Sequence, residues 1–270
     1  MSDRERSQRR TSSPVPVDVH DYADWMFNEF EVEVERLGEQ HDRVSLAMKT
    51  QFEGSDFWQA FLRRLPEVGS AYYVRTGGFP LGSMATPVVV RKSWPSFWLK
   101  TFRRNALDND RWPRPPLGGW LLPETWYTRV GDTVRTRVVV RYLDGIGDVV
   151  ALLSELSDSN RRKARVTYQA REEGYYAAHV DVRRSFEVPK SSFDTSRIPS
   201  SVEIQVTTQV KDVIGELLHR YYERRRRLVA DEDYVWQWDY LSDVFRAGYL
   251  GHMAHYLEGV IMELRGRATP

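Results

Sequence analysis

The chain has 270 residues, of which 39 are Lys or Arg and 38 are Asp or Glu, so its formal net charge is +1. This balance argues against a protein that coats nucleic acid, and the absence of Cys excludes disulfides, thiolate metal sites and cysteine nucleophiles. The apolar runs are too short for a membrane span or a secretory signal, so we expect a folded cytoplasmic protein without a membrane partner.

The N-terminal part of the chain predicts a tail followed by helices. Residues 1–16 are polar, rich in Ser and Arg and poor in apolar side chains, so we expect them to be disordered. From Asp18 to about Leu65, apolar residues recur every three or four positions. This spacing predicts helices, with a break near Gly54.

The middle of the chain changes to the pattern of strands and loops. Residues 86–92 are rich in β-branched side chains and predict a strand, and a helix is expected from Pro95 to Arg104. Residues 105–126 are rich in Pro, Gly and Trp and predict an irregular insertion. Loops of this length are usually functional or mobile.

The clearest strand covers residues 132–142, where Val and Thr alternate with Arg135, Arg137 and Arg141. Three arginines on one face cannot be buried in apolar packing, so they face water or an anion. The elements expected after it are a helix over 145–156, strands over 164–170, 176–188 and 201–208, and helices over 209–229 and 242–265.

No repeat or flexible linker divides this pattern, which predicts one α+β domain over residues 17–270. We expect a mixed β-sheet of about five strands, flanked by N-terminal and C-terminal helices. Such a sheet can place residues from separate strands close together, so the polar positions within the strands are the candidates for a site.

Two acidic residues stand among the cationic positions. Asp132 opens the strand of arginines, and Glu203 shares one face of a later strand with Gln205 and Thr207. A carboxylate on a sheet face is costly to bury unless it meets a cation or a metal. Two carboxylates converging on adjacent strands indicate a Mg²⁺–polyphosphate site, because Mg²⁺ binds one or two carboxylates plus substrate phosphates. A solvated outer face is the alternative that the residues leave open.

Four segments occur in the order in which one known family carries them. They are Lys92-Ser-Trp-Pro-Ser96 with Lys100, Asp132-Thr-Val-Arg-Thr-Arg137, Gly174-Tyr175 with His179, and Val202-Glu203-Ile204-Gln205. On these residues the chain resembles the RelA/SpoT nucleotidyltransferases, and in particular the small single-domain alarmone synthetases. The resemblance spans roughly residues 73–265 and implies a nucleotidyltransferase-like fold and transfer of pyrophosphate from ATP to a nucleotide 3′-hydroxyl.

The resemblance also implies a role for each matched residue. Asp132 and Glu203 would be catalytic and would bind Mg²⁺, and Glu203 would alternatively take the proton of the acceptor hydroxyl. The residues that would bind ATP are Arg91, Lys92, Ser96, Lys100 and Arg137. On the acceptor side, Tyr175 would stack on the base and His179 would reach a phosphate, with Gln205 beside them.

The chain departs from the family pattern at several positions. Val90 stands where the family has an ATP-contacting arginine, Arg135 where it has glycine, and Thr207 where it has a late-strand arginine. Ala177 stands where the acceptor loop of the family has serine. These departures bear on adenine recognition and on the acceptor more than on the metal chemistry.

Three functions are compatible with the resemblance. The leading hypothesis is a pyrophosphokinase that transfers the β,γ-pyrophosphate of ATP to GDP or GTP and makes (p)ppGpp. The first alternative is a toxin-type relative that pyrophosphorylates the 3′ end of tRNA, for which the basic run 224–227 would be a landing site; an antitoxin partner would fit this alternative. The second is a degenerate nucleotide- or RNA-binding module, and a homo-oligomer is compatible with all three.

Two further histidine motifs have structural explanations that we favour. His41-Asp42 is similar to the metal dyad of a phosphohydrolase, but too few residues precede the first strand for such a domain, so no hydrolase is expected. His252 and His255 lie three apart on a predicted helix, a spacing that can bind metal. Without an evident third ligand, they are expected to serve helix packing.

Overall fold

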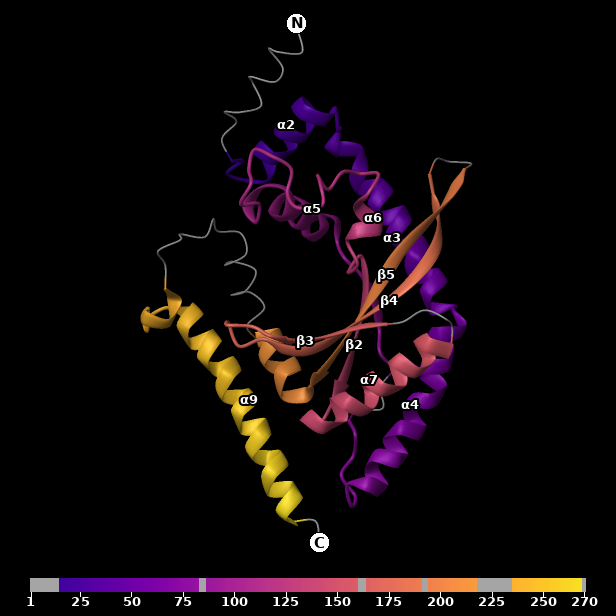
Figure 1. Ribbon diagram of the computed structural model, residues 1–270, viewed down its shortest axis with the longest axis vertical. Helices are drawn as coiled ribbons and strands as arrows, with labels where there is room; N and C mark the ends of the chain where they lie inside the picture. The colour runs from indigo at the N-terminus through magenta and orange to yellow at the C-terminus, as the bar shows by residue number, and fades with distance from the viewer. Residues whose placement is uncertain (1–14, 83–85, 160–163, 191–193, 218–234, 269–270) are drawn as a thin grey trace, which may run out of the picture. The chain divides into compact units, whose positions relative to one another are not determined.

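The structure is a computed structural model that describes residues 15–82, 86–159, 164–190, 194–217 and 235–268 (Figure 1). It divides into unit 1, comprising Met1–Met48, Arg91–Thr133 and Ser185–Ser200, and unit 2, comprising Lys49–Val90, Val134–Arg184 and Ser201–Pro270. The single domain expected over 17–270 stays a prediction. Most of the predicted tail and the whole basic run 224–227 lie outside the described residues.

Unit 1 is mainly helical. Its elements are α2 (Val19–Phe30), η1 (Val34–Arg36), the first part of α3 (Leu37–Glu53), α5 (Trp94–Phe102), the π-helical turn η2 (Arg103–Leu107) and α6 (Trp126–Arg129). Asp18 caps α2, because its carboxylate accepts the backbone N–H groups of His20 and Asp21. Pro95 lies in the first turn of α5, as its fixed φ favours. The predicted helix there is confirmed.

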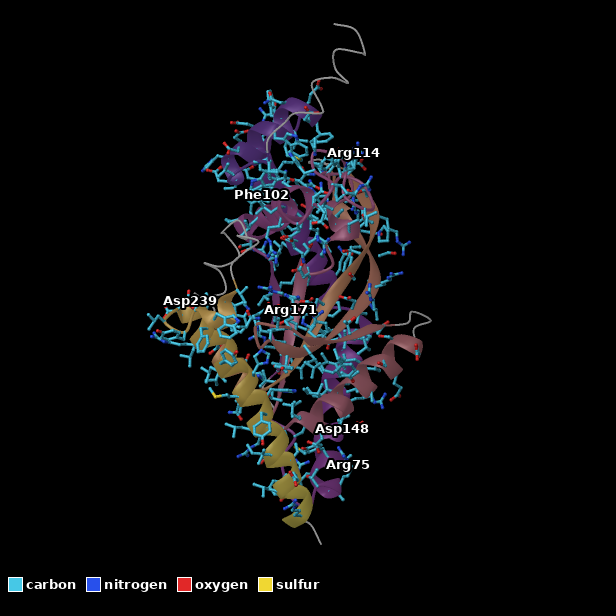
Figure 2. The ribbon with its side chains drawn as sticks, turned by 60° about the vertical axis from the view of Figure 1, so that its left-hand side comes forward. Arg75, Phe102, Arg114, Asp148, Arg171 and Asp239 are labelled. Carbon is cyan, nitrogen blue, oxygen red and sulfur yellow. The ribbon has the colours of Figure 1, made fainter. Side chains whose placement is uncertain are left out.

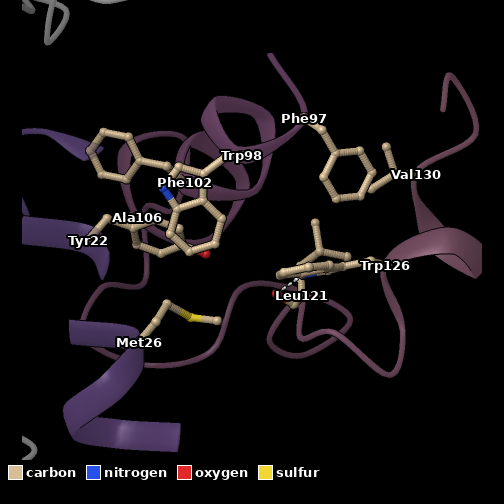
Figure 3. Close-up of a cluster of buried hydrophobic side chains, with 9 residues drawn as sticks. All are labelled: Tyr22, Met26, Phe97, Trp98, Phe102, Ala106, Leu121, Trp126 and Val130. Carbon is tan, nitrogen blue, oxygen red and sulfur yellow. Dashed lines mark hydrogen bonds between the residues drawn. The ribbon is translucent and has the colours of Figure 1, made fainter. Parts of the chain in front are cut away.

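An aromatic core holds unit 1 together (Figure 3). Its fully or nearly buried side chains are Tyr22, Met26, Phe97, Trp98, Phe102, Ala106, Leu121, Trp126 and Val130. The predicted insertion over 105–126 closes this core: the Nε1–H of Trp126 donates to the carbonyl of Leu121 at 3.0 Å, and the rings of Trp112 and Trp120 each lie 4.9 Å from that of Trp25. The insertion is irregular in its backbone, yet its aromatic side chains belong to the core.

Unit 2 carries most of a five-stranded mixed sheet, and this confirms the predicted α+β fold class. The strands are β1 (Val89–Arg91), β2 (Val134–Val140), β3 (Arg165–Ala170), β4 (Tyr176–Pro189) and β5 (Thr195–Thr208), in the order β1-β2-β5-β4-β3. Strands β2 and β5 run parallel with Arg135 opposite Glu203, and β3 and β4 run antiparallel with Thr167 opposite His179. Strand β5 begins six residues before its predicted start, and its first half belongs to unit 1.

Strand β2 shows the alternation that the sequence predicts. Val134, Thr136, Val138 and Val140 are buried, whereas Arg137 on the opposite face is exposed. The side-chain period of a strand is two, so a buried apolar row forces the intervening arginines to the other face.

Helices α4 (Asp56–Arg75) and α7 (Leu143–Ser159) lie side by side in unit 2. The predicted break at Gly54 is confirmed, because α3 ends at Glu53 and Ser55 caps α4. Figure 2 shows Arg75 of α4 and Asp148 of α7 near one another, and their ion pair measures 2.5 Å.

The C-terminal part of the described chain is helical as well. A helix covers residues 209–217, and η3 (Trp236–Trp238) precedes the long α9 (Asp243–Ala268). Within the described residues, no helix has the length and apolar character that would be needed to cross a membrane. Helix α9 confirms the last predicted helix and extends it by three residues at its C-terminal end.

One buried side chain in unit 1 offers a test of the core. Asn105 donates from Nδ2 to the hydroxyl of Tyr22 (2.7 Å) and to the carbonyl of Leu121 (3.0 Å), and its Oδ1 accepts the N–H of Leu121 (2.8 Å). We expect Asn105→Ala to lower the free energy of unfolding by about 3 kcal/mol, since buried groups would lose their partners. Urea unfolding followed by Trp fluorescence measures it. The exposed Asn28→Ala is the control, and equal stability of the two variants would contradict this account.

Candidate functional site

A buried ion cluster lies in unit 1, where the residue after β1, helix α5 and the segment before β2 supply one charge each. The Asp132 carboxylate contacts the Nζ of Lys92 through Oδ2 at 2.9 Å and the Nζ of Lys100 through Oδ1 at 2.7 Å. The side chains of Asp132 and Lys92 are each 11% exposed, and that of Lys100 is 29% exposed. Three of the predicted site residues are therefore brought together.

Electrostatics fix the charge state of this cluster. Burial opposes ionisation of Asp132, but the charges of Lys100 and Lys92 outweigh it and hold the pKa of the carboxyl well below its usual range. Burial also lowers the pKa of Lys100, against the attraction of Asp132. With two ammonium groups around one carboxylate, the cluster carries a net positive charge that suits a polyphosphate.

Hydrogen bonds from helix α3 hold Arg91 and Lys92 in place. The backbone N–H of Lys92 donates to the carbonyl of Thr133 at 2.9 Å, and the Lys92 carbonyl accepts the Nε2–H of His41 at 2.8 Å. Arg91 donates to the carbonyl of Asp42 at 3.0 Å and lies 3.3 Å from the hydroxyl of Ser45. The position of Lys92 is thus set through its backbone.

His41 is a structural residue in this arrangement. Its ring is fully buried, and its centroid lies 4.4 Å from that of Phe97; burial lowers its pKa, so it is neutral at physiological pH. Nε2 is engaged by the carbonyl of Lys92, and Nδ1 lies 3.5 Å from the hydroxyl of Tyr127. The structure therefore gives His41 a positioning role.

The donor set around Asp132 fits Mg²⁺ only together with a substrate. Asp132 Oδ1 is buried and lies 2.7 Å from the Nζ of Lys100, so this carboxylate oxygen would be available to a cation once Lys100 shifts. Among the described residues, no group of three His, Cys, Asp or Glu side chains could hold a metal ion. A Mg²⁺ held by one carboxylate plus substrate phosphates is the arrangement that this chain can provide.

A hydrogen-bonded chain of four predicted residues lies in unit 2. The hydroxyl of Tyr175 lies 2.9 Å from His179 Nε2, His179 Nδ1 lies 2.9 Å from Glu203 Oε2, and Gln205 Nε2 donates to Glu203 Oε1 at 2.6 Å. The Glu203 carboxylate accepts the Nδ1–H of His179, and Nε2 of the same ring faces the Tyr175 hydroxyl. The three residues predicted to bind the acceptor and Glu203 thus form one group.

The backbone before this chain makes a tight turn. The N–H of Gly174 donates to the carbonyl of Arg171, and that of Arg171 donates to the carbonyl of Tyr175, each at 2.9 Å. Gly174 has φ +79°, a conformation that favours glycine because it has no Cβ. The Arg171 guanidinium lies 5.6 Å from the centroid of the Tyr175 ring (Arg171 is labelled in Figure 2). The turn presents Tyr175 in a defined orientation.

The other predicted residues have local partners. Arg137 forms an ion pair with Asp212 at 2.5 Å, and Ser96 Oγ accepts from the Ser93 hydroxyl at 3.1 Å in the first turn of α5. Of the departures, Val90 is exposed and Thr207 is buried. Asp132 belongs to unit 1 and Glu203 to unit 2, so their convergence, and the ligand roles of all these residues, stay predictions.

The sequence reasoning missed one residue that contacts this region. Lys211, the third residue of the helix over 209–217, lies over the ring of Tyr176 with its Nζ 4.6 Å from the centroid. A lysine near the start of a helix is usually expected to be solvated. Only its place three residues after the end of strand β5 could have indicated that it lies close to the strand of Glu203.

The Asp132 cluster predicts a pH-dependent stability. The folded pKa lies below the unfolded value of about 3.9, so the ionised carboxylate stabilises the fold fully above that value and loses this effect as the pH falls toward the folded pKa. We expect Asp132→Asn to lower the free energy of unfolding by about 3 kcal/mol at pH 7, because two lysines lose their counter-charge.

The difference from wild type should shrink as the pH falls from 4 to 3, and urea unfolding at pH 7, 5, 4 and 3 measures it. The exposed Asp110→Asn serves as the control in the same unit. A difference that stays constant with pH would contradict the assignment of the ion cluster.

No family model and no curated protein matches the sequence. The small alarmone synthetase 1 from Bacillus subtilis bound to its product pppGpp is 15% identical and matches with a TM-score of 0.50 over 87% of this chain and 98% of that chain. A GTP pyrophosphokinase family protein from Streptococcus pneumoniae is 17% identical over 87% of this chain and 93% of that chain, with a TM-score of 0.49. This chain has the fold of a small alarmone synthetase.

Proposed function

We propose that the chain is a Mg²⁺-dependent pyrophosphotransferase that moves the β,γ-pyrophosphate of ATP to the 3′-hydroxyl of GDP or GTP. The observation that carries the proposal is the chain of hydrogen bonds from Tyr175 through His179 to Glu203 and Gln205. It combines an aromatic ring, an imidazole and an oriented carboxylate, which are the groups needed to hold a nucleoside and to take a proton from its hydroxyl.

On the acceptor side, Glu203 acts as the general base. The 3′-oxygen of the acceptor forms a bond to the β-phosphorus of ATP, the bond between that phosphorus and the α,β-bridging oxygen breaks, and AMP leaves with the electron pair. The hydroxyl proton passes to the Glu203 carboxylate. A carboxylate can accept about four hydrogen bonds, so it can receive the substrate hydroxyl in addition to His179 and Gln205.

On the donor side, Lys92 and Lys100 bind the phosphates of ATP and Asp132 binds Mg²⁺. The metal, when bound, neutralises charge on the phosphate oxygens and orients them for in-line displacement. A polyphosphate would compete with Asp132 for both ammonium groups, and the shift of Lys100 would leave Oδ1 for the cation. Arg91, Ser96 and Arg137 are assigned to ATP on the resemblance.

The guanine nucleotide is proposed as the acceptor because a protein of the same fold is described as bound to its product pppGpp. In this chain Tyr175 would stack on the base, held in orientation by its bond to His179. The residue assignments rest on the motif resemblance, whereas the contacts among Tyr175, His179 and Glu203 come from the structure.

The test is an assay with Mg²⁺, labelled ATP and three acceptors in parallel: GDP, GTP and deacylated tRNA. Transfer of label to GDP or GTP, with one AMP released per product, supports the proposal. Transfer to tRNA alone would overturn the choice of acceptor and establish the toxin-type alternative. Absence of product with all three acceptors would overturn the enzymatic assignment and favour a binding module.

The Glu203→Gln variant tests the general-base role of Glu203 separately from the other functions of the site. The amide keeps the size of the side chain and cannot accept the proton, so we expect kcat to fall about 10²–10⁴-fold. The KM for ATP should change little, because Glu203 contacts the acceptor. Steady-state kinetics with varied ATP and acceptor measure both constants.

The exposed Glu216→Gln is the matched control and should keep wild-type kinetics. If Glu203→Gln lowered kcat no more than this control, the general-base role would be wrong. Thermal unfolding of both variants checks that the fold is retained.

A further inference from the structure

The backbone of helix α9 and the backbone of the turn that carries Tyr175 lie so close together that a Cβ atom would not fit between them. A Cβ on Gly174 would lie 2.5 Å from the carbonyl oxygen of Gly248, and a Cβ on Gly251 would lie 2.6 Å from the carbonyl oxygen of Gly174. Both distances are too short for real atoms, so the contact requires glycine on both sides. The backbone of the turn rests directly on the backbone of α9.

Polar side chains of α9 hold the same turn. The Nε2–H of His252 donates to the carbonyl of Glu172 at 2.7 Å, which leaves Nδ1 to accept the hydroxyl of Tyr176 at 2.9 Å. The ring of His255 stacks on that of Tyr176 with centroids 3.8 Å apart and an angle of 11°. The two histidines therefore serve packing, as expected, and they bind the residues on both sides of Gly174 and Tyr175.

Lys211 ties a third element to this contact. Its ammonium donates to the carbonyl of Gly251 and lies against the face of Tyr176, with the side chain 8% exposed. The titratable groups that face it are Glu258 and His255, both on α9. Burial lowers the pKa of Lys211 to about 8, although the negative charge of Glu258 acts in the opposite direction.

Helix α9 is itself anchored at both ends within unit 2. Near its C-terminus, Arg265 forms an ion pair with Asp144 of α7 and donates to the hydroxyl of Tyr72 of α4 at 2.7 Å. Near its N-terminus, a Cβ on Gly248 would lie 2.5 Å from the ring of Trp236. The helix can therefore act as a rigid support for the turn.

We propose that α9, through Gly251 and Lys211, is the positioning element that sets the conformation of the turn over 171–175 and thereby the affinity for the acceptor. The proposal rests on the acceptor role given above to Tyr175 and His179. It assigns no chemistry to α9: Gly251 and Lys211 act only through the position of Tyr175. Such positioning matters, since a displacement of about 1 Å can cost about 10²-fold in rate.

The primary test compares Gly251→Ala with Gly259→Ala in the full-length protein. Both substitutions add one methyl group to α9 and remove one helical glycine, but nothing lies within 4 Å of a Cβ on Gly259. We expect Gly251→Ala to raise the KM for the acceptor about tenfold and to leave the KM for ATP within about twofold. Gly259→Ala should match wild type in both. Equal acceptor KM values for the two variants would overturn the proposal.

Hydrogen exchange gives a readout that does not depend on catalysis. Amides of residues 171–176 should exchange faster in Gly251→Ala than in Gly259→Ala, because the turn is displaced from its support. Unchanged exchange would overturn the proposal even if no activity were found. Faster exchange with an unchanged acceptor KM would also overturn the positioning role of α9. If the proposed function itself were wrong, the wild type would form no product.

Lys211→Met supplies an independent variant with a pH signature. In the wild type, Lys211 loses its charge as the pH rises through about 8. This loss weakens the attraction of Lys211 to the Tyr176 ring, so the acceptor KM should rise between pH 7 and 9. In Lys211→Met the acceptor KM should be raised at pH 7 and should not show this rise. Parallel profiles of acceptor KM against pH for wild type and variant would overturn the role of Lys211. Circular dichroism checks that the variant keeps its helical content, to which α9 contributes.

Discussion

Asp132 keeps its negative charge in a nearly buried position only because two ammonium groups contact its oxygens. This constraint determines much of unit 1 around it. Lys92 must stay beside Asp132, and its backbone is fixed on one side by the carbonyl of Thr133 and on the other by His41 of α3. The buried neutral imidazole of His41 thus serves the charged cluster without joining it. The aromatic core, closed by the 105–126 segment, supports α5 and hence Lys100.

The Glu203 carboxylate also needs partners, because little of its side chain is exposed, but the groups that contact it differ from those around Asp132. Its partners include the imidazole of His179 and the amide of Gln205, and these hydrogen bonds orient both carboxylate oxygens. Asp132 suits a cation and phosphates, and Glu203 suits a hydroxyl. The surroundings of the two carboxylates therefore support the division between metal ligand and general base in the proposed reaction.

Helix α9 shows how a distant segment can determine a local conformation. Gly174 adopts φ +79° and lies against the backbone of Gly248 and Gly251, so this packing of the turn on the helix requires glycine at Gly174 and Gly251. The arrangement gives a physical reason for glycines within a long helix, where each one otherwise lowers helix stability by about 1 kcal/mol relative to alanine. Lys211 and the two histidines add contacts on the residues that flank Tyr175.

The sequence by itself determined the elements and the chemistry of the candidate residues. The alternation in 134–140 identified β2 and its buried face, the break near Gly54 separated α3 from α4, and motif order selected Asp132, Tyr175, His179 and Glu203. Tertiary structure alone decided their partners, because hydrogen bonds between residues such as His41 and Lys92 join segments 51 positions apart. Local periodicity carries no information about such pairs, nor about the contact of Gly174 with Gly251. The roles of His41 and Lys211 therefore follow only from the contacts that these residues make in the folded chain.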